Sequence, residues 1–407
     1  MKLQPMTIGT SKLALIGPAF VAGVAYLDPG NVATNLTAGS AYGYSLLWVI
    51  VFANLAAWVV QYLAAKLGYI SSASLPELVA GLVKSKPLRL GYWAQAQLVA
   101  IATDIAEVIG GALALYLLFD LPLILGAIAT ALFSVLHLYL RESGRVRIFE
   151  GIVYLLIAIT AFGFSLGLFS RDLEFAKMAE GLVPGFEDKA ALLLVAGIVG
   201  ATIMPHAIYA HSALSRDKLK IQDKDRTFLT IVRWDVSLAM LVAGAINVAI
   251  LLVGAINLYG GEVENSIVGA HSAILASLGS VVAAFFAIGL LASGAASSSV
   301  GTYASTVITE GLLNRRISLI TQRCIALGPA LIVVAIAPDP TMALVLSQVV
   351  LSLGIPFALF PLLFFTSRQS TMGEFVNSRA LSTIGMAIAI TLTVLDLALV
   401  ALVLSGW

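Results

Sequence analysis

The chain has 407 residues, of which 60% are hydrophobic and only 11% are charged, with a formal net charge of +1. Soluble domains carry about 25% charged residues, so this composition excludes an ordinary soluble protein, and the near-neutral charge gives no indication of nucleic-acid binding. A transmembrane helix needs about 20 mainly apolar residues, and the chain has many such runs, without the alternating ~10-residue segments of a β-barrel. We therefore predict an all-α polytopic membrane protein.

Eleven apolar segments are predicted, and no separate soluble domain is expected within 1–407. In chain order they cover 13–40, 44–68, 91–118, 122–140, 147–169, 189–214, 229–258, 270–311, 317–337, 341–366 and 380–404. Three are longer than one span needs. The segments at 13–40 and 189–214 carry internal breaks, and the one at 270–311 could extend beyond the bilayer. The single cysteine, Cys324, provides no disulfide framework.

Basic residues mark alternate loops. They are frequent in the loops at 70–90, 141–146 and 215–228, and later alternate loops hold Arg315, Arg316, Arg368 and Arg379. Of the 23 basic residues, the opposite loops hold only Arg171, Lys177 and Lys189. By the positive-inside rule, we expect a multi-pass protein of a prokaryotic plasma membrane with its N-terminus in the cytoplasm and its C-terminus outside. Residues 1–27 could instead form a signal peptide, but the apolar run continues beyond them.

The first segment contains AYLDPGNVATN, residues 25–35, in which Asp28 is the only charged residue between Lys12 and Lys66. Pro29 removes an amide donor and Gly30 permits unusual dihedrals, so we expect a helix break that frees the carbonyls of Ala25 to Leu27. Such backbone survives in a membrane only where protein or a water-filled cavity surrounds it. Asp28 could be a helix cap, but a buried acid costs about 2.5–3.5 kcal/mol on insertion scales, which favours a functional role.

A second break is predicted in GATIMPHAIYAH, residues 200–211. No Asp, Glu, Lys or Arg lies between Lys189 and Arg216, and Pro205 interrupts this sixth segment as Pro29 interrupts the first. Breaks in segments 1 and 6 fit two five-helix halves, and an odd number of helices per half inverts the second half. Paired interruptions of this kind are a sequence indicator of a transporter's binding site.

The side chains and freed carbonyls at the two breaks indicate a cation. Asp28 and Asn31 offer hard oxygen ligands, the carbonyls of Ala25 and Ala201 add more, and Met204 offers a thioether. Sulfur shifts the preference from magnesium or calcium toward softer transition metals, and no lysine or arginine lies near either break to bind an anion. A divalent transition-metal ion fits best, although Met204 alone would be read as a core gap-filler.

The motifs DPGN and MPH, with ATDIAEVIG, LLASGAASSSVGT and LSQVVLSLGIPFAL, resemble the Nramp family of proton-coupled divalent metal transporters over essentially the whole chain. The resemblance implies a LeuT-like fold, with inverted five-helix repeats at 12–170 and 188–367 and an eleventh helix at 379–405. It implies import of manganese and ferrous iron, with cadmium and cobalt tolerated. The metal is then a substrate and not a prosthetic group, the other partners are protons and the lipid bilayer, and a monomer suffices.

The same resemblance assigns the metal ligands. It implies that Asp28, Asn31, Met204 and the Ala201 carbonyl coordinate the metal. The Ala25 carbonyl would join in one state of the cycle. Gln348 matches a glutamine that reaches the metal in other states.

Few ionisable groups are available for proton transfer within the membrane. Asp104 and Glu107 lie three residues apart and so on one helix face, His206 and His211 lie in segment 6, and Arg323 lies in segment 9. Intramembrane ionisable residues are functional candidates by default. Asp104 and Arg323 could form a structural ion pair, and His211 could be a wetted interface residue, whereas Glu107 has no evident structural partner and is favoured as a relay.

The resemblance orders these groups into a route. It implies that Asp28 takes the driving proton and that Glu107, Asp104 and Arg323 pass it inward, with His206 affecting the coupling. Some relatives carry two adjacent basic residues where this chain has Gln322 and Arg323, so the inner end of the route departs from the family pattern.

Three further features carry expectations. The small polar run SGAASSSVG at 293–301 is expected to allow close helix packing in preference to substrate contact. Asn247 is expected to hydrogen-bond the broken region. Asp235 and Asp396 are left without a role.

Three other function classes were weighed. A carrier of organic cations or amino acids on the same fold would leave Met204 beside Asp28 unexplained. A channel would show a filter or ring motif, and a zinc protease would show His-Glu-x-x-His. Neither motif is present in the chain, so we predict a transporter and not an enzyme.

Overall fold

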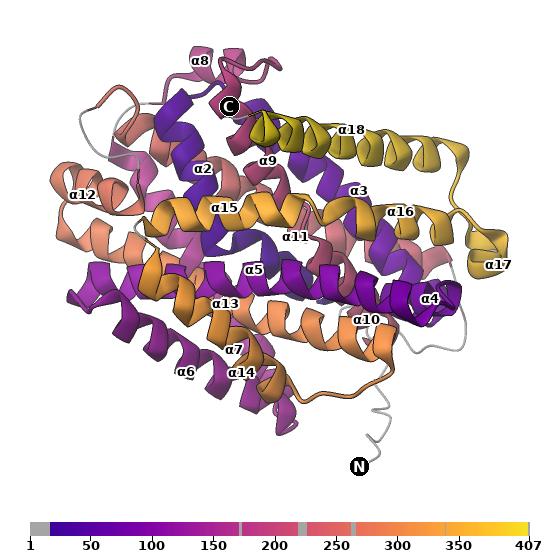
Figure 1. Ribbon diagram of the computed structural model, residues 1–407. Coiled ribbons are helices and arrows are strands. Elements are labelled where there is room, and N and C mark those ends of the chain that lie inside the picture. Colours follow the sequence, from indigo (N-terminus) through magenta and orange to yellow (C-terminus); the bar gives the residue numbers. More distant parts are fainter. Residues whose placement is uncertain (1–16, 171–172, 219–225, 262–265, 338, 406–407) are drawn as a thin grey trace.

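A computed structural model describes residues 17–170, 173–218, 226–261, 266–337 and 339–405. Every regular element in these ranges is a helix (Figure 1). Within the same ranges, ten helical stretches are long and apolar enough to cross a membrane. The first predicted segment forms a further pair of short helices, whose described part begins at residue 17. The prediction of an all-α polytopic membrane protein is confirmed.

The helices follow the predicted segments closely. The long ones are α3 (Leu47–Ser71), α5 (Lys86–Phe119), α6 (Leu123–Glu142), α7 (Val146–Leu166), α11 (Arg226–Asn257), α13 (Ser280–Leu313), α14 (Leu319–Ile336) and α18 (Arg379–Leu404). The broken segments form α1 (Pro18–Gly23) and α2 (Pro29–Tyr42), α9 (Lys189–Thr202) and α10 (Pro205–Lys218), and α15 (Pro340–Ser352) and α16 (Ile355–Thr366). Short helices are α4 (Leu75–Leu82), α8 (Phe175–Glu180), α12 (Ile267–Leu278) and α17 (Gln369–Met372).

Both predicted breaks are present. A 3₁₀ helix, Val24–Leu27, ends at Asp28, which has extended backbone (ψ 162°), and α2 begins at Pro29. Proline suits the first position of a helix because its missing amide hydrogen would have no partner there. The second break lies between Thr202 and Pro205, where α10 again begins with a proline.

Two expectations about the later segments are wrong. The segment at 270–311 is two helices, because Gly279 turns the chain with a φ of +85° between α12 and α13. The segment at 341–366 has a third break, between Ser352 and Ile355, which we did not predict. Each of these segments is mainly apolar over its whole length, so the sequence pattern did not indicate that the chain turns at a glycine, Gly279 in the first and Gly354 in the second. The predicted loop at 70–90 also contains α4, and α5 begins at Lys86.

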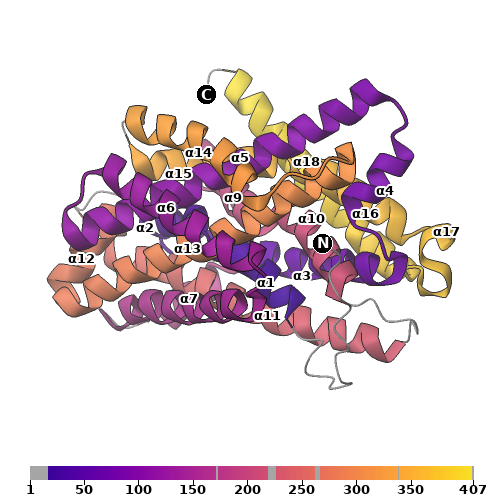
Figure 2. The ribbon, with the colours of Figure 1, turned by 90° about the horizontal axis from the view of Figure 1, so that it is seen from below.

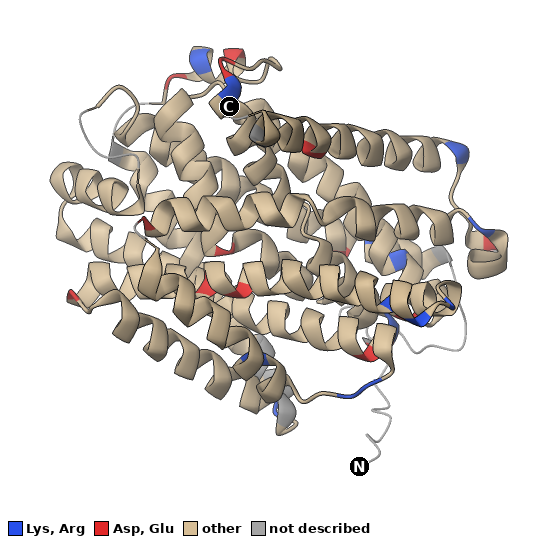
Figure 3. Cartoon of the chain, in the orientation of Figure 1, with Lys and Arg blue, Asp and Glu red and all other residues tan. Residues whose placement is uncertain are grey.

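The broken pair α9 and α10 lies deep inside the bundle of long helices, whereas α15 and α16 also expose apolar side chains such as Leu346 and Phe357. Helix α5 packs along α13, with α7 on the other side of α13, while α2 packs on α11 and α15 on α9 (Figures 1 and 2). Helix α18 lies at the margin, against α16. Acidic residues are visible in the middle of the bundle, whereas most basic residues lie at helix ends (Figure 3). We name the end that carries Arg89, Arg216, Arg316 and Arg379 the basic end.

Two glycines let the third broken segment approach the other two. A Cβ on Gly200 of α9 would lie 2.0 Å from the carbonyl oxygen of Gln348 and 2.8 Å from the amide nitrogen of Ser352. A Cβ on Gly30 of α2 would lie 1.6 Å from Nε2 of Gln348. Since real Cβ contacts are never this short, glycine at both positions is what allows α15 to carry Gln348 between the two predicted breaks.

We predict that Gly200→Ala destabilises the protein, because the added methyl group meets backbone atoms of α15 that cannot move aside. Overpacking of this kind costs about 1–3 kcal/mol. The matched control is Gly151→Ala in α7, where a Cβ would meet nothing within 4 Å and where alanine favours the helix. Melting temperatures in detergent should fall for the first variant and stay level or rise for the second. Equal melting temperatures for the two variants would contradict the packing argument.

Candidate functional site

Asp28 is fully buried and is the N-cap of α2. Its Oδ1 accepts hydrogen bonds from the backbone N–H of Asn31 at 2.8 Å and from Nδ2 of Asn31 at 3.0 Å. Its Oδ2 accepts a hydrogen bond from Nε2 of Gln348 at 3.2 Å. The capping interpretation of Asp28 is therefore correct, and the cap lies where segments 1 and 10 meet.

The Asn31 side chain joins the two predicted breaks. Its Nδ2 also donates to the carbonyl oxygen of Ala201 at 2.6 Å, across 170 residues of sequence. Met204, three residues beyond Ala201, is fully buried, as are Asn31 and Gln348. The structure thus brings Asp28, Asn31, Ala201 and Gln348 into one hydrogen-bonded cluster, with Met204 in the adjoining break.

The cluster contains oxygen atoms that lack partners. Oδ1 of Asn31, Oε1 of Gln348 and the hydroxyl of Thr202 are buried and have no hydrogen-bond partner in the part of the chain that the structure describes. Unsatisfied buried polar atoms are rare in native proteins. The Asn31 NH₂ group, which carries partial positive charge, lies between a carboxylate and a carbonyl oxygen. This donor set suits a cation that takes the place of that NH₂ group.

Carbonyls freed by the first break are bound by neighbouring helices. Asn247 of α11 donates from Nδ2 to the Tyr26 carbonyl at 3.2 Å, as predicted, and the Ser293 hydroxyl of α13 donates to the Leu27 carbonyl. The run at 293–301 also permits close packing, because a Cβ on Gly294 would lie 3.0 Å from the Glu107 carbonyl oxygen. The Ala25 carbonyl lies in the same 3₁₀ helix, and its role as a metal ligand stays a prediction.

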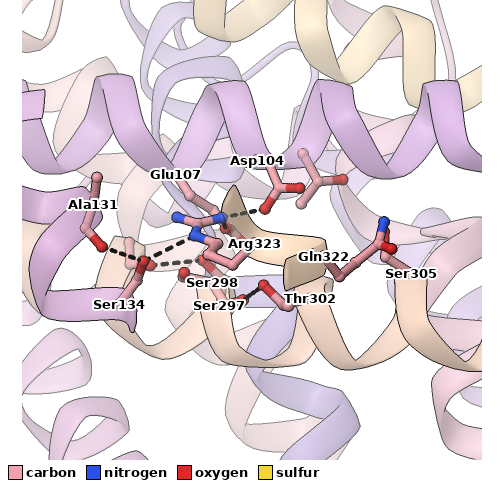
Figure 4. A network of polar contacts seen from close by, with 12 residues as sticks. Asp104, Glu107, Ala131, Ser134, Ser297, Ser298, Thr302, Ser305, Gln322 and Arg323 are labelled. Atoms are coloured by element: carbon pink, nitrogen blue, oxygen red, sulfur yellow. Dashed lines mark hydrogen bonds and ion pairs between the residues drawn. The ribbon is translucent and has the colours of Figure 1, made fainter. Parts of the chain in front are cut away.

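A buried charge network lies between α5, α6 and α14 (Figure 4). The Arg323 guanidinium contacts Asp104 and Glu107 through Nη1, with the Glu107 oxygen at 3.2 Å, and donates from Nε to Ser134 at 2.8 Å. The ion pair between Asp104 and Arg323 is confirmed. The expectation that Glu107 lacks a structural partner is wrong, because the packing of α14 on α5 supplies one. Oε1 of Glu107 and Nη2 of Arg323 have no hydrogen-bond partner among the described residues.

The two histidines of segment 6 are both buried. Nδ1 of His206 forms a hydrogen bond of 3.3 Å with the Thr103 hydroxyl of α5. Nδ1 of His211 donates to Oε1 of Gln61 at 2.6 Å, and the Gln61 amide donates to the Tyr26 hydroxyl. Since His211 is only 1% exposed, the alternative of a wetted interface residue is wrong. We did not predict Gln61 as a partner of His211. The sequence does contain an indication, because a glutamine stands within the otherwise apolar α3.

Neutral polar groups continue from the charge network along α5, α13 and α14. The Gln322 amide donates to Oε1 of Gln97 at 3.0 Å, and the Gln97 amide donates to Thr309 at 2.9 Å and to the Ser305 carbonyl at 3.0 Å. All four side chains are buried. Figure 4 shows Gln322 and Ser305 at one side of the network. Gln322, the neighbour of Arg323 in the chain, is therefore one member of a hydrogen-bonded amide pair with Gln97.

The two acids left without a role have different surroundings. Asp235 of α11 accepts hydrogen bonds from the backbone N–H groups of Gly17 and Ala19, each at 3.0 Å, and so caps the N-terminus of α1. Asp396 is buried in α18, near Ser352 at the third break. Neither of its carboxylate oxygens meets hydrogen-bond geometry with another described residue.

The Nramp family model, described as "Natural resistance-associated macrophage protein-like", matches residues 19–402. The chain belongs to the Nramp family. The match begins just before the first break and ends near the end of α18, so it includes all of the candidate site residues.

Bacterial relatives are similar to this Nramp chain over nearly its full length. A protein of Mycobacterium tuberculosis (strain H37Rv) named "Divalent metal cation transporter MntH" is 48% identical over 395 residues, which cover 96% of this chain and 92% of the relative. A protein of Bacillus subtilis with the same name is 43% identical over 394 residues, which cover 95% and 92% of the two chains.

Solved structures agree with the fold of this Nramp chain. The manganese transporter of Eremococcus coleocola, in complex with an aromatic bis-isothiourea compound, aligns with a TM-score of 0.85 at 33% identity, covering 97% of this chain and 88% of that one. Mhp1, a nucleobase-cation-symport-1 family transporter, aligns with a TM-score of 0.54 at 17% identity, covering 97% and 91% of the two chains. The second likeness shows only the fold, which is the predicted LeuT-like one.

We predict that Arg323→Met strongly destabilises this Nramp chain, because it leaves Asp104 and Glu107 without a buried counter-charge. Breaking a buried ion pair from one side costs about 3–5 kcal/mol, so the melting temperature in detergent should fall. The control is Arg316→Met, which removes a side chain that is 91% exposed in its pair with Glu310 and should change stability by no more than about 0.5 kcal/mol. A melting temperature unchanged by Arg323→Met would show that the network does not hold α14 to α5.

Proposed function

We propose that this chain imports divalent transition-metal ions, manganese and ferrous iron above all, across a bacterial plasma membrane by proton-coupled alternating access. The observation that carries the proposal is the cluster of Asp28, Asn31, Ala201 and Gln348, in which three separate helix breaks meet and oxygen ligands lack partners. The names of the relatives support it, since they are called divalent metal cation transporters or a manganese transporter. On this proposal the protein is a transporter and not an enzyme, with cadmium and cobalt as tolerated substrates.

Each residue of the cluster has a distinct part in metal binding. The Asp28 carboxylate supplies negative charge, and the Ala201 carbonyl and the Asn31 amide oxygen supply neutral ligands once the Asn31 side chain turns its oxygen toward the ion. Gln348 and the Ala25 carbonyl contribute in particular states of the cycle. The Met204 thioether favours transition metals over calcium and magnesium, because those hard cations prefer oxygen ligands.

Proton coupling would use the groups next to the metal site. Asp28 releases its proton as the dication binds, and Glu107 and Asp104 pass it toward the basic end, with Arg323 on the same route as the fixed counter-charge of both acids. The free Oε1 of Glu107 is available for this step, and Gly301 leaves room beside it, since a Cβ there would lie only 3.1 Å away. His206 and His211 adjust the coupling through their contacts with Thr103 and Gln61.

The inverted repeats at 12–170 and 188–367 and the extra helix at 379–405 provide the frame for alternating access. Residues 12–16, 219–225, 262–265 and 338 of these ranges lie outside the described part of the chain. On this proposal the basic end faces the cytoplasm, with the N-terminus inside and the C-terminus outside. The distribution of basic residues supports this orientation. The cargo site is fully buried in this structure, so each half of the cycle requires movement of α1 and α2 relative to α9 and α10.

We predict that Asp28→Ala abolishes manganese uptake, because it removes the only acid of the cluster. Purified protein in proteoliposomes would be tested with Mn²⁺ outside, at external pH 5.5 and 7.5 with an internal pH of 7.5. The unmodified protein should accumulate Mn²⁺ and acidify the lumen, whereas the variant should do neither while keeping its size-exclusion profile. Saturable Mn²⁺ uptake by the variant would refute the proposed site, and uptake of amino acids in place of metals would support the alternative carrier.

We predict that Met204→Ala weakens cadmium binding and admits calcium and magnesium as competitors, because the site then offers oxygen ligands alone. The measurement is Cd²⁺ affinity by calorimetry together with inhibition of Mn²⁺ uptake by excess Ca²⁺ or Mg²⁺. The control is Met240→Ala in α11, a buried methionine that packs near Gly23 and should leave selectivity unchanged. If Met204→Ala retains the selectivity of the unmodified protein, the thioether does not select the metal.

A further inference from the structure

A polar cavity of about 660 Å³ opens at the basic end. Charged side chains line it, and most of them are paired. Arg216 pairs with Glu77 at 2.5 Å and with Asp217 at 2.8 Å, and Arg316 pairs with Glu310 at 3.0 Å. Because both arginines are already neutralised by acids, the cavity is poorly suited to hold an anion. Its walls come from α4, from the end of α10 and from the end of α13.

Helix α4 is attached to α10 by two polar contacts. The backbone N–H of Leu75 donates to the Ser212 hydroxyl at 3.0 Å, and Glu77 pairs with Arg216 through Oε1. The other oxygen of Glu77 accepts the backbone N–H of Ser74 at 2.6 Å, which completes the capping box of α4. The capping box therefore holds the Glu77 side chain in the orientation that meets Arg216.

Glycines bring α4 and α10 against their neighbours. A Cβ on Gly311 of α13 would lie 2.6 Å from Cβ of Pro76 and 3.0 Å from the amide nitrogen of Glu77. A Cβ on Gly68 of α3 would lie 2.0 Å from the Ser212 carbonyl oxygen. Helix α4 is thus seated against α13, and α10 against α3, so a contact between α4 and α10 links two parts of the bundle.

The contact lies on the helix that leaves the metal site. Helix α10 begins directly after Met204, and Arg216 is 12 residues further along the chain, which is roughly 18 Å at the helical rise. Any outward swing of the basic end of α10 must separate Arg216 from Glu77 and Ser212 from Leu75.

We propose that Glu77, Arg216 and Ser212 form a latch that holds α10 to α4 and adds a small stabilisation to the closed state of the basic end of the transporter. The proposal rests on the proposed transport function and assigns these side chains as positioning residues, because none of them contacts the metal cluster. The side chains of Arg216 and Glu77 are 22% and 40% exposed. An ion pair with this exposure is screened by water and weak, so it can stabilise the closed end slightly and still be released in every cycle.

The latch is stable near neutral pH. Partial burial alone would raise the pKa of Glu77, but the hydrogen bonds from Ser74 and Arg216 and the charge of Arg216 outweigh it and lower the pKa below its ordinary value. A carboxyl with a lowered pKa keeps its ion pair above that pKa and loses it only as the pH falls through it. Changes of cytoplasmic pH around 7 therefore leave the latch intact, and α10 must be displaced by events at the metal site.

The test is a double-mutant cycle read by hydrogen exchange of backbone amides in the full-length protein in nanodiscs, without metal. Glu77→Gln removes the charge but retains the capping box, which accepts glutamine, and Arg216→Gln removes the partner. Each single change should speed exchange in 75–82 and 205–217 by about 1.5- to 5-fold, as expected for a weak pair. The double change should add little to either single change, and 1 M salt should reproduce the effect in the unmodified protein.

The matched control is Glu310→Gln with Arg316→Gln, a pair that lines the same cavity and joins α13 to the segment that follows it. These changes should leave exchange in 205–217 unaltered, and all variants should keep Mn²⁺ affinity within about two-fold, since the pair is remote from the cluster. Unchanged exchange in the Glu77 and Arg216 variants, or strictly additive effects, would overturn the latch. Failure of Mn²⁺ to bind the unmodified protein would instead refute the proposed function, so the two failures are distinguishable.

Discussion

The two unwound segments meet in the middle of an apolar bundle, and the Asn31 carboxamide joins them by bonding to Asp28 on one side and to Ala201 on the other. Backbone that leaves the helical pattern at membrane depth needs protein or water to satisfy it. Asn247 and Ser293 meet that need for the Tyr26 and Leu27 carbonyls. These two carbonyls are satisfied, whereas the side-chain oxygens Oδ1 of Asn31 and Oε1 of Gln348 have no hydrogen-bond partner among the described residues.

This constraint accounts for the position of several features away from the cluster. Gly30 and Gly200 are required because Gln348 must reach Asp28 from a third segment without a methyl group in its way. Asp28 caps the helix after the first break, Asn31 bonds to Ala201 before the second, and Gln348 comes from the helix before the third. The three broken segments therefore share one hydrogen-bonded cluster. The buried charge network shares no side chain with this cluster and joins α5 to α14.

The local sequence predicts the features that depend on local chemistry. Proline after an acid and proline after a methionine are visible as breaks, and the ligand types at those breaks indicate a transition metal. Pairings between side chains of distant segments were harder to predict from the sequence. Arg323 is 216 residues from Glu107 and His211 is 150 residues from Gln61, so neither pairing is contained in any single segment. The break between α15 and α16 was missed because residues 341–366 satisfy the length and hydropathy of one span, and hydropathy does not record where a helix is interrupted.

The contacts at the two ends of the broken helices are weaker than those in the centre. At one end the Tyr42 hydroxyl of α2 donates to Asp188 at the start of α9, at 2.7 Å, and at the basic end Glu77 pairs with Arg216. A partly exposed ion pair contributes about 0.2–1 kcal/mol, whereas moving a two-state equilibrium from 1:99 to 99:1 requires about 5.5 kcal/mol of differential binding. Neither end contact can therefore set the conformational state. A dication among buried oxygens can supply free energy on that scale, because Coulomb interactions strengthen where water is excluded. The ends then need only to be weak enough to follow the centre, and the partly exposed pair of Glu77 and Arg216 meets that requirement.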